Sequence, residues 1–199
     1  MHSRHLTALL CTTIAAIAVA GCGSTSNGQA TPAPSSSAAG DPILAPKVTD
    51  PIANTESYAS DPCSAVPSSE VESLGGPIKQ TKTDNSDSGN LCVWTFTDLH
   101  GSASGGLLTK QTSGINGLYI DHQKGYLTTF TPHAPIAGYP AVIYARGGES
   151  EGNCNLAVGV RDDLAYTVVM LLRSGPAQSN ACGIAEQIAT TAVEHMKGK

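Results

Sequence analysis

Residues 148–152 carry a sequence pattern that is typical of a covalent catalyst. The segment Gly148-Glu149-Ser150-Glu151-Gly152 has the spacing of a nucleophile elbow, in which the serine hydroxyl attacks an acyl group. Such an elbow follows a strand and precedes a helix, and its serine needs a histidine as base. Here the run after the motif is strand-like, and the carboxylates beside Ser150 would oppose an oxyanion. The sequence therefore predicts a polar hairpin loop, with a Ser150 hydrolase as the alternative.

Four histidines outside the N-terminal region could act as bases or bind a metal: His100, His122, His133 and His195. Sites of this kind bring their ligands together in the sequence, commonly as HExxH on one helix. Neither that pattern nor a His-x-His pair occurs, and Asp121 beside His122 is a single neighbouring carboxylate. We therefore expect no catalytic residue, no metal site and no cofactor.

Cys22 has a position that favours covalent modification. It follows a weakly basic start and an apolar run from Leu6 to Ala20, which fits a signal peptide and is short for a membrane span. The run ends in Val19-Ala20-Gly21-Cys22, which resembles the bacterial lipobox. We predict that residues 1–21 are a signal peptide and that lipid on Cys22 anchors the chain to the extracytoplasmic face of the cell membrane. An ordinary secretory peptide cut elsewhere is the alternative.

The remaining cysteines favour disulfides. Once Cys11 is removed with the signal peptide and Cys22 is lipidated, four are left: Cys63, Cys92, Cys154 and Cys182. An even set in an oxidising compartment predicts two bridges, and three pairings are open. We favour Cys63–Cys92 and Cys154–Cys182, because each would join a predicted helix to a predicted strand nearby in the sequence. Zinc is disfavoured because no CxxC pair occurs.

Composition divides the mature chain into a tether and one domain. Residues 22–60 are rich in Ser, Thr, Pro, Ala and Gly, a composition that cannot bury enough apolar surface to fold, so we predict a disordered tether. Residues 61–199 suffice for a single domain. The chain has 11 Lys and Arg against 16 Asp and Glu, without a block of like charge, which argues against binding to nucleic acid.

The periodicity of apolar residues predicts an α+β domain, in which an antiparallel β-sheet is packed by a short N-terminal helix and a longer C-terminal helix. Trp94 lies on an alternating strand and is interpreted as core, with a pocket-lining role as the alternative. The Gly-rich segment 101–106 is predicted to be a flexible connection and residues 131–140 an exposed loop. Asn180 is the predicted N-cap of the last helix. The helices are expected at 68–74, 115–124 and 181–196, and the strands at 78–83, 91–97, 106–112, 126–130, 141–146, 155–161 and 166–172.

Short motifs in a fixed order resemble the actinobacterial lipoprotein family known as domain of unknown function 3558. They are Asp61-Pro62-Cys63-Ser64, Cys92-Val93-Trp94, Ile136-Ala137-Gly138-Tyr139-Pro140-Ala141, Cys154 with Leu156-Ala157-Val158-Gly159-Val160, and Ala181-Cys182 at the start of the last helix. One departure is Pro67-Ser68, where the family usually has Thr-Pro. The resemblance implies an extracytoplasmic domain but transfers no catalytic residue, because the family has no established activity.

Together these observations favour a membrane-anchored, non-enzymatic module that binds a cell-envelope ligand or a partner protein. An envelope serine hydrolase using Ser150 and a purely structural surface lipoprotein are the alternatives. The membrane, reached through the lipid on Cys22, is the expected partner.

Overall fold

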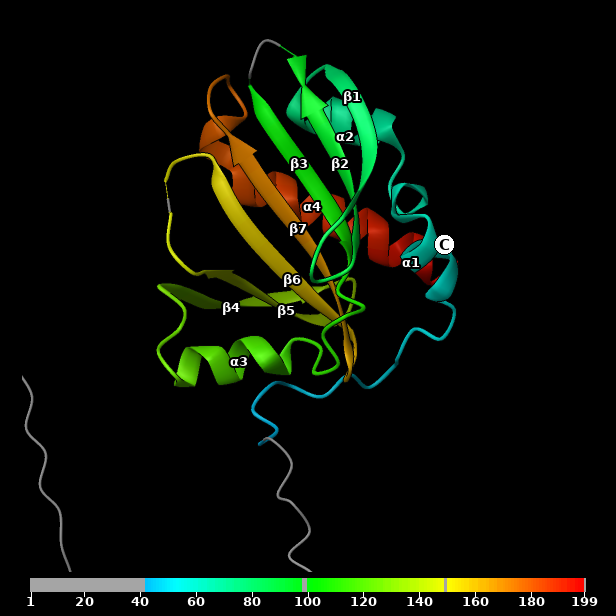
Figure 1. The fold of residues 1–199 in the computed structure, drawn as a ribbon, viewed down its shortest axis with the longest axis vertical. Coiled ribbons are helices and arrows are strands. Elements are labelled where there is room, and N and C mark those ends of the chain that lie inside the picture. Colours follow the sequence, from blue (N-terminus) through cyan, green and yellow to red (C-terminus); the bar gives the residue numbers. More distant parts are fainter. Residues whose placement is uncertain (1–41, 98–99, 149, 199) are drawn as a thin grey trace, which may run out of the picture. The chain divides into compact units, whose positions relative to one another are not determined.

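A seven-stranded antiparallel sheet forms the centre of the protein (Figure 1). The computed structural model describes residues 42–97, 100–148 and 150–198. The strands are β1 (Ile78–Asn85), β2 (Asn90–Phe96), β3 (Gly101–Leu107), β4 (Thr129–Ile136), β5 (Tyr139–Ala145), β6 (Asn153–Arg161) and β7 (Leu164–Leu172). The helices are α1 (Glu56–Ser60), α2 (Ser68–Gly75), α3 (Asn116–Gln123) and α4 (Ala181–Met196), with short turns η1 (Pro62–Ser64) and η3 (Gln178–Asn180).

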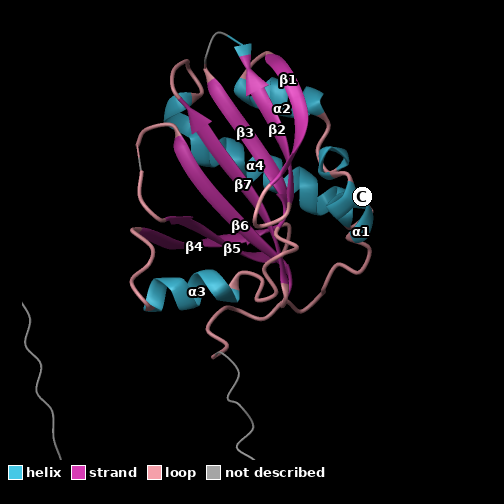
Figure 2. Cartoon of the chain, viewed as in Figure 1, coloured by secondary structure: helices cyan, strands magenta, loops and turns pink. Residues whose placement is uncertain are grey.

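The strand order is β1-β2-β3-β7-β6-β5-β4, so two runs of consecutive hairpins meet where β3 pairs with β7. Helices α2 and α4 lie on one face of this sheet, and α3 lies near β4 and β5 (Figure 2). The predicted α+β class is confirmed, as are the antiparallel sheet, the short helix near the N-terminus and the longer C-terminal helix.

Helix α4 packs on the sheet because one side of it is continuously apolar. Its buried residues recur at helical spacing, from Ala181 and Ile184 to Val193 and Met196. Alanines between them let the helix lie close to β6 and β7. The helix has its predicted bounds, but Asn180 stands at the N-cap position without a side-chain capping hydrogen bond.

Alternate side chains of the strands point to the face that the helices cover. Cys92, Trp94 and Phe96 of β2 are fully or almost fully buried on this helix-covered face. Trp94 also donates a hydrogen bond from Nε1 to Ser68 Oγ at the start of α2. The interpretation of Trp94 as a core residue is confirmed.

Both predicted disulfides are present. Cys63–Cys92 joins η1 to β2, and Cys154–Cys182 joins β6 to the first turn of α4. Each bridge therefore fastens a helical element to the sheet, which is the arrangement that favoured this pairing.

The folded unit begins earlier than the expected boundary at residue 60. Residues 42–55, called here the N-terminal strap, lie against the domain, with Val48 and Ile52 buried in the main core. Asn116 accepts hydrogen bonds from the backbone of Leu44 and Ala45 and donates one to Pro42. The strap is held by a few apolar residues and by backbone hydrogen bonds. Because the rest of the strap is polar, its composition does not distinguish it from the predicted tether.

Two segments predicted as loops are strands. The Gly-rich segment begins β3, where a Cβ added to Gly105 would lie 2.6 Å from the hydroxyl of Tyr166, so small residues there reflect close packing rather than flexibility. Residues 131–140 belong to the hairpin of β4 and β5. Pro132 and Pro135 are compatible with a strand because β4 is at the edge of the sheet.

Candidate ligand-binding face

Ser150 lies in an exposed loop between two antiparallel strands. The loop joins β5 to β6, and the Ser150 carbonyl accepts a hydrogen bond from the backbone of Asn153. A strand therefore follows the motif where a nucleophile elbow would have a helix. Within the described residues, no hydrogen bond joins Ser150 to a histidine.

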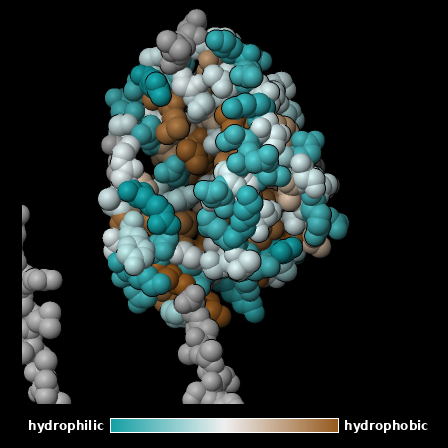
Figure 3. Space-filling model, viewed as in Figure 1, coloured by the Kyte–Doolittle hydropathy of each residue, from teal (hydrophilic) through white to brown (hydrophobic). Residues whose placement is uncertain are grey.

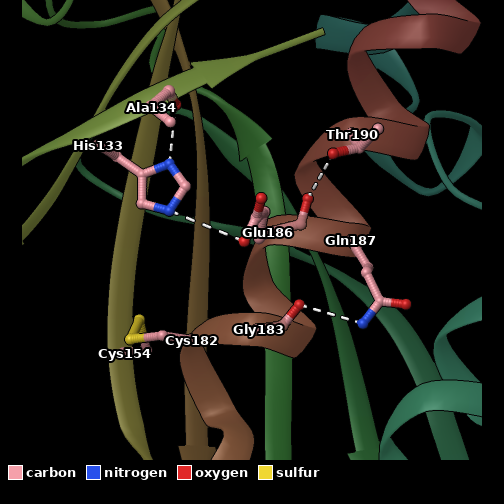
Figure 4. Close-up of polar contacts among 8 residues, drawn as sticks. All are labelled: His133, Ala134, Cys154, Cys182, Gly183, Glu186, Gln187 and Thr190. Atoms are coloured by element: carbon pink, nitrogen blue, oxygen red, sulfur yellow. Dashed lines mark hydrogen bonds and ion pairs between the residues drawn. A yellow bond between two sulfur atoms is a disulfide. The ribbon is translucent and has the colours of Figure 1, made fainter.

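The four histidines are dispersed over the fold. His133 of β4 donates from Nδ1 to the Ala134 carbonyl, and its Nε2 lies 3.7 Å from the Glu186 carboxylate on α4, beside the Cys154–Cys182 bridge (Figure 4). His195 donates to the Ala65 carbonyl at 3.0 Å, and the His122 ring stacks on Phe130. In the part of the chain that the structure describes, no group of three or more His, Cys, Asp or Glu could hold a metal ion.

Cys22 lies outside the described residues. Among those described, none of the helices has both the length and the apolar character needed to cross a membrane.

The sheet face opposite α4, called here the open face, carries half-buried side chains of a different kind. Register places Val93, Ser104, Val169 and Asn155 in one row across β2, β3, β7 and β6. A second row holds Thr95, Ser102, Leu171 and Asn153. Ser104 thus lies between two valines, and Ser102 lies between Thr95 and Leu171. Figure 3 shows this face, with apolar atoms in a hollow that is rimmed by polar ones.

Helix α3 covers only one end of this face. Ile115 and Leu118 pack on Val142, Ala157 and Ala165 in a second, smaller core beneath it. Beyond α3, no helix of the described residues lies in front of β1, β2, β3 and the far halves of β6 and β7 (Figure 1). This uncovered part contains the hollows described next.

One hollow is a cleft where β5 and β6 separate, called here the β5–β6 cleft. The two strands pair only from Ala141 to Ile143, and beyond this the amide of Asn155 donates to the Tyr144 carbonyl at 3.1 Å. The loop that follows turns through Gly147 and Gly148, both with positive φ. The cleft has a volume of about 360 Å³, and Thr129, Tyr144, Asn153, Asn155 and Leu171 are among its lining residues.

The β5–β6 cleft has two neighbours on the same face. A hollow of about 330 Å³ near α3 shares Tyr144, Gly147 and Asn155 with it. A shallower one of about 510 Å³ lies beyond Leu171 and has Lys79 and Arg173 on its rim. Because Leu171 lines both the cleft and this shallower hollow, the open face offers one hollowed surface of small-ligand dimensions.

A further hollow of about 330 Å³ lies between the strap and the turn after β6. Its rim includes the ion pair of Arg161 and Asp163, whose atoms are 2.9 Å apart. The hydrogen bond from Arg161 lowers the pKa of Asp163 and raises that of the guanidinium. Asp162 accepts a hydrogen bond from the Val48 backbone, so this region fastens the strap.

Sequence reasoning did not identify the open-face residues. Those on β3 were assigned to a flexible connection, although the alternation of Ser102, Ala103 and Ser104 is a strand signal. Tyr144, Asn153 and Asn155 carried no motif. What brings them together is the separation of β5 from β6, which no local pattern in the sequence encodes.

Comparisons with known proteins place the chain in a wider group. A family model described as "Protein of unknown function (DUF3558)" matches residues 17–195. The match starts within the apolar run before Cys22 and ends in the last turn of α4. No match was found among the curated proteins or among the solved structures.

Proposed function

The chain belongs to the DUF3558 family of proteins of unknown function, as its motifs indicated, and from this premise we propose that it is a membrane-anchored lipoprotein that binds a small envelope ligand. The observation that carries the binding role is the hollowed open face, with the β5–β6 cleft at its centre. Its volume lies in the range of small-molecule sites, and its lining combines apolar side chains with a few polar groups, as in such sites.

Binding rather than catalysis is the role that this face supports. The described residues that line the β5–β6 cleft carry mainly hydroxyl, amide and aliphatic side chains and include no histidine. The helix-covered face holds the core and both disulfides, so the scaffold is rigid behind the cleft. A rigid scaffold lowers the entropic cost of ordering a binding surface.

Anchoring is the second part of the proposal. The apolar run and the lipobox-like segment that ends in Cys22 support lipidation, export and a position on the outer face of the cell membrane. Cell fractionation tests it with Cys22→Ser. We expect the wild type in the membrane fraction and the variant free in the medium or retained as an unprocessed precursor. A variant that still sediments with membranes as a processed, lipid-bearing chain would refute the anchor.

Native mass spectrometry of the purified full chain, incubated with envelope extract, tests the binding role. Leu171→Trp fills the open face at a side chain that is 45% exposed, so the fold should tolerate it. Tyr126→Trp is the matched control, since Tyr126 is 60% exposed and does not line the cleft. We expect a bound species on the wild type and the control and its loss from Leu171→Trp. Equal retention by all three proteins would contradict the proposal.

A further inference from the structure

We propose that the β5–β6 cleft takes a neutral, polyhydroxylated ligand, a carbohydrate ring, and binds it mainly by accepting hydrogen bonds from its hydroxyl groups. This inference rests on the proposed binding role and names the class of ligand for it. Three observations carry it: the charge of the lining residues, the direction of the hydrogen bonds along the wall, and the apolar side chain at the mouth.

The described residues that line the cleft include no charged side chain. In the adjoining hollow near α3, Arg146 is the charged residue, and its guanidinium is paired with Asp121. Among these described residues an anionic or cationic ligand would find no counter-charge to offset its lost hydration, which is costly. Neutral ligands do not face that cost.

Hydrogen bonds already made by the protein decide what Tyr144 can offer a ligand. Thr167 donates its only hydroxyl proton to the Leu156 carbonyl at 3.1 Å. The hydrogen bond between Tyr144 and Thr167, 3.4 Å long, must therefore be donated by Tyr144. Its proton is used, and the Tyr144 oxygen remains an acceptor.

The two asparagines on the cleft wall are oriented in the same sense. Asn155 directs its NH₂ group to the Tyr144 carbonyl, and Asn153 directs its own to the Gly148 carbonyl at 2.7 Å. Because an amide nitrogen must face a carbonyl, each Oδ1 remains an acceptor with two lone pairs, beside one remaining N–H donor on each amide. No hydrogen bond to either Oδ1 is found among the described residues. Tyr144, Asn153 and Asn155 thus form a neutral set of acceptors.

A ligand that matches this set has several hydroxyl donors and no charge. A pyranose ring meets both conditions, and it also has C–H faces that can lie on Leu171, which is half exposed at the mouth. A volume of about 360 Å³ is of the size that small-molecule sites have. A protein side chain inserted into the cleft could not supply as many hydroxyl groups.

Calorimetric titration of the purified full chain with defined sugars tests the inference. The probes are methyl glucoside and maltotriose as neutral ligands, glucuronate as an anion and glucosamine as a cation. We expect maltotriose or methyl glucoside to bind at least about tenfold more tightly than either charged sugar, a difference of about 1.4 kcal/mol. Glucuronate binding as tightly as the neutral sugars, through Lys79 and Arg173, would overturn the proposal.

Tyr144→Phe gives the residue-level test, because it keeps the ring and removes the acceptor oxygen. Thr167 keeps its bond to Leu156 in this variant, so the fold should persist, which thermal unfolding checks. We expect the affinity for the neutral sugar to fall about five- to tenfold, and to stay unchanged in the control Tyr126→Phe. Unchanged affinity in folded Tyr144→Phe would remove Tyr144 from the site and contradict the acceptor set.

The outcomes separate this inference from the proposed function. If no sugar binds, but the envelope species detected by mass spectrometry is retained by the wild type and lost from Leu171→Trp, the binding role stands and the carbohydrate inference is wrong. If neither sugar nor envelope species binds, both are wrong.

Discussion

The two faces of the sheet use the same strands for different purposes. On the helix-covered face, β2 and β7 present Trp94, Phe96, Tyr166 and Met170, all buried. On the open face of the same strands, Val93, Thr95, Val169 and Leu171 are half buried or exposed. The helix-covered face also has both disulfides. Most of the stabilising contacts therefore lie on the helix-covered face. The side chains of the open face are left available for contacts with other molecules.

Neighbouring residues of β2 give the largest contrast between the faces. Trp94→Ala empties a fully buried site on the helix-covered face and should lower the free energy of unfolding by about 3–5 kcal/mol. Val93→Ala, one residue earlier on the open face, should cost about 1 kcal/mol or less. Urea unfolding monitored by circular dichroism measures both. Equal losses would show that the open face is packed as firmly as the other.

The disulfides give the next largest effect. Replacing Cys154 and Cys182 together by alanine frees a loop with a sequence separation of 28 and should cost about 2–5 kcal/mol. Because the bridge holds α4 to β6, hydrogen exchange should rise in α4 more than in β2 and β3. Exchange that rises evenly over the whole sheet would contradict a local role for the bridge.

Two tyrosines on the helix-covered side test whether every polar atom there is stabilising. The Tyr166 hydroxyl is fully buried and has no hydrogen-bond partner among the described residues, and burial raises its pKa. Tyr166→Phe should therefore leave stability unchanged or raise it by up to about 1 kcal/mol. Tyr139→Phe removes a 2.7 Å hydrogen bond to the Asp50 carbonyl and should cost about 0.5–1.5 kcal/mol. Thermal unfolding compares the two variants. If Tyr166→Phe lost more stability than Tyr139→Phe, the Tyr166 hydroxyl would have to have a hydrogen-bond partner.

The smallest effect is expected at the ion pair near the strap. Asp163 is largely exposed, so Asp163→Asn should cost less than about 1 kcal/mol at pH 7. Its pKa is lowered from 3.8 in the folded state, so the pair stabilises above that value and loses its contribution as the pH falls through the lowered pKa. The variant and wild type should therefore converge in acid. If the difference in stability between wild type and Asp163→Asn grew below pH 3.8, the assigned direction of the pKa shift of Asp163 would be wrong.

The sequence predicted best those elements whose apolar residues recur at regular local spacing. The apolar stripe of α4 and the alternation of Cys92, Trp94 and Phe96 predicted two elements that lie on the same side of the sheet, and each is joined to another element by a predicted bridge. The strap was missed because Val48 and Ile52 are isolated apolar residues in a polar segment. Segment 101–106 was assigned to a connection because tight packing and flexibility both call for small residues.

The cleft depends on the separation of two strands, which no regular spacing of residues in the sequence predicts. Asn155 reaches the Tyr144 carbonyl because β5 and β6 have separated, and the separation depends on a turn that uses glycines at positive φ. Of the two, Gly148 was noticed in the sequence only as part of a serine motif, and Gly147 lies just outside it. Both lie in the loop that follows the point where the two strands separate.

Under the proposed anchoring, the strap is also the place where mechanical load enters the domain. A pull applied at residue 42 would first strain the hydrogen bonds of Asn116, then the bond from Val48 to Asp162, and last the bond from Ile52 to Val160 of β6. The strap would peel away in steps, and the sheet would be loaded only after it. Shear between cell and surroundings would thus be absorbed before it reached the open face.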